Sequence, residues 1–171
     1  MAIKKSLILL ILSLAAVSVS GQTLERRLNV AVLDFGDHST GRLVSETIAE
    51  NLKGNKNVSV QDRDQARAAA RGASYNGSIN LSLEEARHLG SVLGTDFFLV
   101  GDAQTLRRSP STGPIYFESY ASLFLVSSRT GRLITWSRPV FEAATAGGAE
   151  SALIGKLATA EIEDHLAKLI T

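Results

Sequence analysis

The sequence predicts an α/β (α+β) fold, a single three-layer domain built on a mixed five-stranded sheet. Two observations predict the layers. Leu83–Asp102 carries a helical apolar pattern followed at once by the apolar run Phe97–Val100, and Val30–Phe35 is a second short apolar run that precedes another helical pattern. A third observation adds a β-hairpin, because Arg129–Gly131 has the composition of a tight turn between two alternating segments.

The first half of the chain alternates strands and helices. After the strand Val30–Phe35, we expect a helix with Thr40 as its N-cap and with an apolar face at helical spacing, formed by Leu43, Val44, Ile48 and Leu52. A short strand at Val58–Gln61 follows, and Asp62 opens an alanine-rich helix. Right-handed crossovers between these strands make the first three parallel.

The helix that begins after Ser82 is bounded on both sides. Ser82 and Glu85 have the spacing of a capping box, and Gly94 supplies a left-handed stop. The strand after Gly94 is continuously apolar, so we expect it to be covered on both faces.

The hairpin consists of Ile115–Ser128 and Arg132–Phe141, with Gly131 at a left-handed bulge position. This turn sets two apolar pairs on one face of the sheet: Val126 with Ile134, and Phe124 with Trp136. Pro139 cannot donate to an interior ladder and is expected near an edge. The segment Arg107–Pro114 is the predicted flexible loop.

A C-terminal helix at Ala149–Ile170 closes the predicted sheet. Its apolar stripe contains Ile154, Leu157, Ala158, Ile162, Leu166 and Leu169. The predicted strand order is 2-1-3-4-5, with three parallel strands and then an antiparallel meander. We expect Trp136 to be buried beneath this helix.

The first residues have the pattern of a secretory signal peptide. Lys4 and Lys5 precede a short apolar stretch, and Ser18 and Ser20 supply small residues before a cleavage point. We therefore expect residues 1–21 to be a signal peptide that is cleaved, and residues 22–171 to form one periplasmic domain. Because the chain has no cysteine, it is not expected to be lipidated, and disulfide, thiol and zinc–cysteine chemistry are excluded.

Charge argues against a nucleic-acid partner. Removing Lys4 and Lys5 leaves 16 basic residues, from 18 minus 2, against 17 acidic ones, so the mature domain is near neutral. Nucleic-acid binding calls for a clustered basic surface. Arg67, Arg71 and Arg87 are interpreted as solvated helix faces.

Five segments in order resemble the CsgG-type family, bacterial envelope proteins that include the curli secretion component. The segments are VAVLDF, VSETIAENL, VSVQDRDQARAAARG, EEARHLGSVLGTDFFLVGDAQTL and SLFLVSSRTGRLITWS, within Leu28–Leu169. The family is similar in fold to the TolB N-terminal domain and to the peptidoglycan-synthase activator lipoproteins. The resemblance implies a non-catalytic module that binds envelope proteins in curli-like export, surface-structure assembly or control of cell-wall synthesis. It also makes self-association possible.

Neither a pore nor a firm membrane attachment is expected. No segment outside the predicted sheet is long enough for the membrane-inserting hairpins of the curli pore, whose strands need about 9 to 11 residues. We therefore expect at most peripheral association with the outer membrane.

One cluster of polar residues keeps a second function open. Asp34, Asp37 and His38 follow the first strand, at the carboxyl end where α/β sheets usually place ligands. The alternative function is thus a small periplasmic ligand-binding protein or hydrolase that uses this loop. Asp and His are also ordinary loop and capping residues, and no second histidine has metal-ligand spacing. No catalytic, metal or cofactor-binding residue is therefore assigned, and no cofactor is expected.

Overall fold

The computed structural model describes residues 27–158. They form one mixed sheet and four helices, which confirms the predicted fold class. In chain order the elements are β1 (Leu28–Val32), α1 (Ser39–Lys53), β2 (Val58–Val60), α2 (Arg63–Gly72), α3 (Leu83–Leu93), β3 (Phe97–Arg108), β4 (Tyr116–Ser127), β5 (Leu133–Ser137), β6 (Val140–Ala143) and α4 (Ala146–Leu157).

The strand order is β2-β1-β3-β4-β5, as predicted, but the sheet has six strands. β1 pairs in parallel with β2 and β3, whereas β4 is antiparallel to β3 and to both β5 and β6. The sixth strand arises because Pro139 divides the predicted strand Arg132–Phe141 into two. Pro139 lies at the sheet edge, where its carbonyl accepts a hydrogen bond from the Ala121 amide at 3.2 Å and no N–H is needed.

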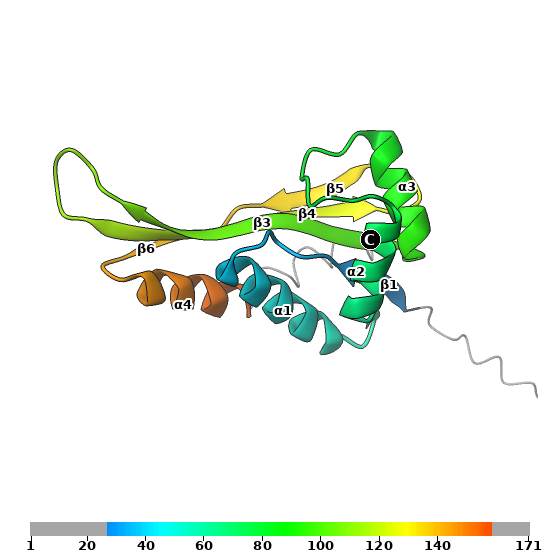
Figure 1. Ribbon diagram of the computed structural model, residues 1–171. Helices are drawn as coiled ribbons and strands as arrows, with labels where there is room; N and C mark the ends of the chain where they lie inside the picture. Colours follow the sequence, from blue (N-terminus) through cyan, green and yellow to red (C-terminus); the bar gives the residue numbers. More distant parts are fainter. Residues whose placement is uncertain (1–26, 159–171) are drawn as a thin grey trace, which may run out of the picture.

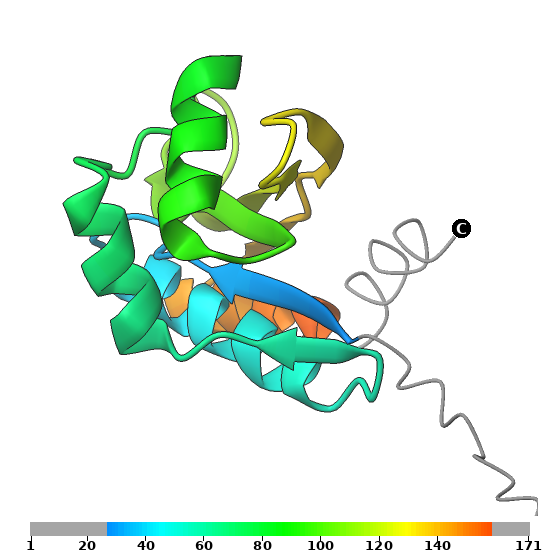
Figure 2. The same cartoon turned by 90° about the vertical axis from the view of Figure 1, so that its right-hand side faces the viewer.

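Helices cover the sheet on both faces (Figures 1 and 2). One core cluster joins α1 and α4 to side chains such as Leu99 and Leu125, and the other joins α2 and α3 to side chains such as Phe98 and Val100. Neighbouring residues of β3 thus enter opposite cores, as expected for a strand covered on both faces. The three-layer prediction is confirmed.

Most predicted helix boundaries agree with the structure. Asp62 accepts hydrogen bonds from the amides of Asp64 and Gln65, Ser82 and Glu85 form the capping box, and Gly94 is left-handed at φ 68°. Thr40 is the exception, because His38 occupies the N-cap of α1 without a side-chain bond. The Thr40 hydroxyl instead donates to Glu150 at 2.7 Å and ties α1 to α4.

The β4–β5 register differs from the prediction near the turn. Val126 pairs with Leu133 rather than Ile134, because the turn contains four residues and a bulge at Ile134 corrects the register. Beyond the bulge, Phe124 pairs with Trp136, as predicted.

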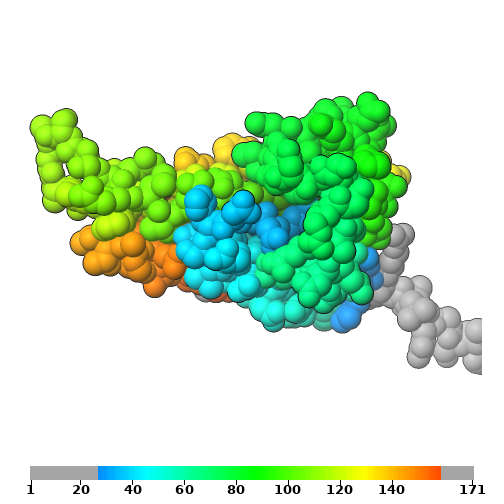
Figure 3. Space-filling model, viewed as in Figure 1, coloured from blue at the N-terminus to red at the C-terminus, as the bar shows by residue number. Residues whose placement is uncertain are grey.

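The β3–β4 hairpin is longer than predicted. Arg107 and Arg108 belong to β3, so the connection is confined to residues 109–115 rather than Arg107–Pro114. The tip of this hairpin extends past the helices (Figures 1 and 3).

The last described helix starts earlier than predicted, and its predicted stripe is confirmed in part, because Leu157 is buried and Ile154 packs against the core. α4 begins at Ala146, after Thr145 accepts a hydrogen bond from the Gly148 amide at 3.1 Å. Its buried residues are Ala149, Leu153 and Leu157, whereas Ala158 of the predicted stripe is exposed. The predicted helix residues Ile162, Leu166 and Leu169 lie outside the described residues, as does the predicted signal peptide at 1–21.

Candidate functional site

Asp34 is held in an ion-pair network just after β1. Arg67 Nε lies 2.8 Å from Asp34 Oδ2, and Arg63 Nη2 lies 2.9 Å from Asp34 Oδ1. Both arginines project from α2, which packs over this end of β1. Arg67 is therefore a structural ion-pair partner, and its interpretation as part of a solvated helix face is wrong.

The pKa of Asp34 shows which interaction dominates. Partial burial raises the pKa, but the hydrogen bonds and positive charges of Arg67 and Arg63 outweigh it, so the pKa lies below its usual value. An aspartate with a lowered pKa and two bound guanidinium groups is a poor general base at neutral pH. Asp34 therefore connects the end of β1 to α2 through ion pairs.

Asp37 and His38 diverge from each other. Asp37 lines a hollow of about 300 Å³ together with Arg71 and Tyr75. His38 lines a separate hollow of about 490 Å³ with Thr105 and Glu150, beside α4. Asp34, Asp37 and His38 therefore do not form one site, although the sequence places them within five positions.

The hollow beside Asp37 contains one unusual group. The Tyr75 hydroxyl is buried and has no hydrogen-bond partner within the described part of the chain. Burial, assisted by the negative charge of Asp34, raises the pKa of Tyr75 to about 12. The phenol therefore stays protonated at neutral pH and can act as a hydrogen-bond donor.

The most distinctive surface lies on β4, β5 and β6. α4 contacts β4 and β6 on the face that carries Leu123 and Leu125, whereas on the other face α2 contacts β1 and α3 contacts β4. In Figure 1 the stretch of sheet beyond α3 carries no helix on the α3 side. On that side the β4 residues Ser122 and Val126 are buried and Phe124 is half-buried, whereas large apolar side chains of β5 and β6 are exposed.

Trp136 is the central residue of this surface. It is 59 % exposed, and its ring stacks on Phe124 with the ring centroids 6.4 Å apart. The expectation that Trp136 is buried beneath the C-terminal helix is wrong, because α4 covers the opposite face. Four of the nine large hydrophobic side chains exposed among the described residues lie on β5 and β6: Leu133, Ile134, Trp136 and Val140. With Phe124 and Tyr120, we call these residues the Trp136 strip.

Polar contacts continue the strip along β4. The Tyr120 hydroxyl donates to Asp102 at 2.9 Å, and the Arg138 guanidinium lies 4.6 Å from the centre of the Tyr120 ring. Burial and the bond to Asp102 raise the pKa of Tyr120, so this hydroxyl stays a donor. Trp, Tyr and Arg are the residue types enriched at protein-binding hot spots, and here Trp136 and Arg138 are exposed while Tyr120 is half-buried.

The sequence contains a signal for this open face. Along β4, one parity runs Phe117, Ser119, Ala121, Leu123 and Leu125, and the other runs Tyr116, Glu118, Tyr120 and Ser122 before Phe124. Such alternation is typical of a strand with one solvated face. It predicts that this side of β4 is only partly covered as far as Tyr120, a signal that the cross-strand pairs by themselves do not contain.

Two negative findings concern the described residues. Within positions 27–158, no cluster of three His, Asp or Glu side chains has the geometry of a metal site. No helix in that range has the length and hydropathy needed to cross a membrane.

Comparison with known proteins gives the fold but no family. No family model and no curated protein matches the chain. Lipoprotein GNA1162 from Neisseria meningitidis superposes with a TM-score of 0.54 at 16% identity, covering 80% of this chain and 96% of that one. The hypothetical protein CT253 from Chlamydia trachomatis gives a TM-score of 0.50 at 12% identity, covering 77% and 93%. The LpoB C-terminal domain from Salmonella enterica gives a TM-score of 0.47 at 13% identity, covering 70% of this chain and 85% of that one.

At such identities the likeness concerns the fold alone. The predicted relation to lipoprotein folds is supported at this coarse level, whereas membership of the CsgG-type family is not shown. The chain thus shares the fold of a Neisseria lipoprotein, and its own function has to be argued from its surface.

Proposed function

We propose that this chain is a non-catalytic module of the bacterial envelope that binds a protein partner through the Trp136 strip. The observation that carries the proposal is the exposure of Trp136, 59 %, in a ring stack that holds it in place. An exposed, ordered tryptophan among other apolar side chains costs solubility. Such patches on soluble domains usually mark interaction sites.

An envelope location is supported by two observations. Residues 1–21 have the pattern of a signal peptide, and the fold is shared with a Neisseria lipoprotein. A lipoprotein carries its lipid on a cysteine, and this chain has none. We therefore propose an exported periplasmic protein that associates at most peripherally with the outer membrane.

A protein partner fits the strip better than a small ligand does. The strip lies on a strand surface, and its apolar residues are bordered by Arg138, Tyr120 and Asp102, which resembles the apolar centre and polar rim of protein interfaces. Small ligands usually bind in enclosed apolar hollows. The partner is expected to cover Trp136 with an apolar or aromatic side chain.

The identity of the protein partner would show in which cellular process the chain acts. Curli-like export, surface-structure assembly and control of cell-wall synthesis are the three alternatives that the sequence resemblance leaves open, and each uses envelope proteins. Identifying the captured protein selects among them. Self-association would be visible as recovery of the chain itself.

The alternative function requires Asp34, Asp37 and His38 to act together. The structure commits Asp34 to two arginines and places Asp37 and His38 in different hollows. The hydrolase hypothesis therefore has no group of three side chains that could act together in catalysis. A small ligand would have to bind in the hollow beside Asp37 and Tyr75.

The test is capture from envelope extract with four matched baits of residues 22–171. They are the wild type, Trp136→Ala, Leu83→Ala and the double variant Asp37→Ala/His38→Ala. Leu83 on α3 is also 59 % exposed, so its truncation controls for loss of any exposed apolar side chain.

We expect Trp136→Ala alone to lose the captured protein by at least tenfold, since hot-spot tryptophans contribute about 2 kcal/mol or more. Binding of the identified partner is then measured with purified components by calorimetry. Equal capture by the wild type and Trp136→Ala, or loss with Asp37→Ala/His38→Ala, would refute the proposal and favour the loop.

A further inference from the structure

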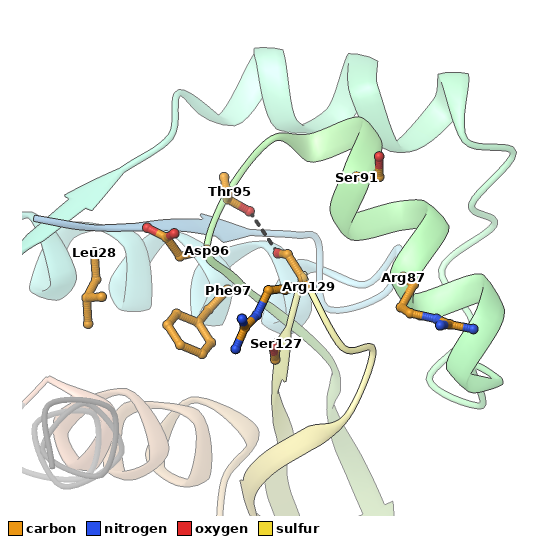
Figure 4. A pocket seen from close by; sticks show the side chains of 9 residues that line it. Leu28, Arg87, Ser91, Thr95, Asp96, Phe97, Ser127 and Arg129 are labelled. Atoms are coloured by element: carbon orange, nitrogen blue, oxygen red, sulfur yellow. Dashed lines mark hydrogen bonds between the residues drawn. The ribbon is translucent and has the colours of Figure 1, made fainter.

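A second open surface lies where β1 and β3 begin and β4 ends. It is a hollow of about 770 Å³ whose lining includes Leu28, Thr95, Phe97 and Arg129. In Figure 4 the side chains of Leu28 and Phe97 point to the same side of the sheet, and the Arg129 side chain extends beside Phe97. Both apolar side chains are only half-buried. We call this surface the Leu28–Phe97 groove.

α4 ends at the same end of the molecule. The Leu157 carbonyl accepts a hydrogen bond from the Asn51 side chain in the last turn of α1, at 3.0 Å. The chain after α1 leads into β2 beside the start of β1, where the Leu28 amide donates to the Asn57 carbonyl at 2.9 Å. The end of α4, the end of α1 and the start of β1 are therefore close together, so the chain leaves α4 beside the groove.

Residues 159–171 follow, with the sequence TAEIEDHLAKLIT. They contain neither glycine nor proline, and Ile162, Leu166 and Leu169 recur at helical spacing. Glu161 and Glu163 flank this stripe at about 100° on either side of Ile162. The segment thus has the pattern of a short amphipathic helix with an acidic border.

This apolar stripe cannot be buried by a straight extension of α4. Ile162 is nine residues after Leu153, and at about 100° per residue it lies roughly 180° from it, on the opposite side of the helix. Leu153 and Leu157 face the core, so a straight helix would point Ile162, Leu166 and Leu169 toward solvent. Burying them requires a change of direction after Ala158.

The length and the charge of residues 159–171 both agree with binding in the Leu28–Phe97 groove. A helix of about 11 residues spans roughly 17 Å, enough to cross a surface that starts beside the end of α4. The residues that line the groove carry two positive charges, Arg87 and Arg129, and one negative charge, Asp96, and in Figure 4 only Arg129 of the two arginines extends beside Phe97. The segment has three acidic side chains and one lysine, so its net charge is opposite to that of the groove.

We propose that residues 159–171 turn after Ala158 and pack as a helix into the Leu28–Phe97 groove of the same chain, with Ile162, Leu166 and Leu169 on its floor. This packing buries Leu28 and Phe97 and places Glu161 or Glu163 near Arg129. The inference is independent of partner binding by the Trp136 strip, because Phe97 packs against the core cluster of α1 and α4, whereas Phe124 of the strip packs on the opposite face of the sheet.

The absence of native cysteine makes disulfide trapping a clean test. Leu28→Cys is combined with Leu166→Cys in one chain, and with Asp164→Cys in the control, where Asp164 lies on the polar side of the same segment. Both proteins are oxidised at low micromolar concentration and analysed by non-reducing electrophoresis and mass spectrometry. We expect an intrachain disulfide in the Leu166 pair at least tenfold faster than in the control.

Other outcomes overturn the proposal. A disulfide-linked dimer shows that the groove receives this segment from a second copy. Equal rates for the two pairs show that no fixed face of the segment meets the groove.

A second measurement does not depend on disulfide geometry. The variant Ile162→Glu/Leu166→Glu should accelerate amide hydrogen exchange in Leu28–Val32 severalfold while exchange in β4 is unchanged. Unchanged exchange in Leu28–Val32 means that the segment does not cover it, which also overturns the proposal.

Discussion

The Asp34 carboxylate lies between two guanidinium groups of α2, 2.9 Å from Arg63 Nη2 and 2.8 Å from Arg67 Nε. The same carboxylate is the residue that the sequence pattern offered as part of a ligand site. Its geometry assigns it to the joint between β1 and α2.

We expect Asp34→Asn to lower the free energy of unfolding by about 1 to 2 kcal/mol, less than the roughly 3 to 5 kcal/mol of a fully buried pair, because the Asp34 side chain is 40% exposed and solvent screens it. Urea denaturation at pH 7 measures this difference. Asp37→Asn, at an exposed position nearby, should change stability by less than about 0.5 kcal/mol.

The same ion pair predicts a pH dependence. The folded-state pKa of Asp34 is below its unfolded value of about 3.9, so its contribution is present above that pH and is lost as pH falls through the folded pKa. The stability difference between the wild type and Asp34→Asn should therefore be constant from pH 5 to about pH 8 and shrink below pH 4. A difference that grows toward acid would contradict the assignment.

Trp136→Ala should have little effect on stability. Its exposed ring loses mainly the stack on Phe124, about 0.5 to 1.5 kcal/mol. Leu125→Ala on the covered face of β4 should instead cost about 2 to 5 kcal/mol, because Leu125 is 1 % exposed. Since Trp136 is the only tryptophan, wild-type fluorescence should also be red-shifted and readily quenched by acrylamide. A blue-shifted, protected emission would show that the strip is covered.

Gly101→Ala should destabilise the domain by roughly 1 to 3 kcal/mol or more. A Cβ at Gly101 would lie 2.2 Å from both Phe35 Cε1 and the Ser122 carbonyl, in the middle of the sheet. Gly147→Ala is the matched control, since a Cβ there meets no atom within 4 Å and alanine favours the helix. Thermal denaturation should therefore show a lower Tm for Gly101→Ala than for the wild type, and an equal or higher Tm for Gly147→Ala.

Export should remove the first residues of the chain. We expect cleavage near Ser20 or Gly21 and release of a soluble periplasmic protein, because a basic start and a short apolar stretch precede small residues. Mass spectrometry of the mature N-terminus checks this. Full-length chain recovered from carbonate-washed membranes would mean that the segment is retained as an anchor.

The sequence by itself determined the local boundaries and the strand order. The Asp62 cap, the Ser82–Glu85 box and the Gly94 stop all agree with the structure because each depends on contacts between residues a few positions apart. The order β2-β1-β3-β4-β5 follows from the alternation of elements together with right-handed crossovers. The Phe124–Trp136 pair was predicted correctly although its turn was not, since the Ile134 bulge offsets the longer turn.

Only the tertiary structure decided which surfaces the helices leave open and which partners the polar side chains take. Trp136 has an apolar pattern suited to a core, yet it is exposed because α4 lies on the opposite face of the sheet. Asp34, Asp37 and His38 are neighbours in sequence. Asp34 nevertheless forms ion pairs with Arg63 and Arg67, about 30 residues later in the chain. Asp37 and His38 line two different hollows. Burial and ion pairing depend on distant parts of the chain meeting in space, and the periodicity of a single segment contains no information about what packs against it.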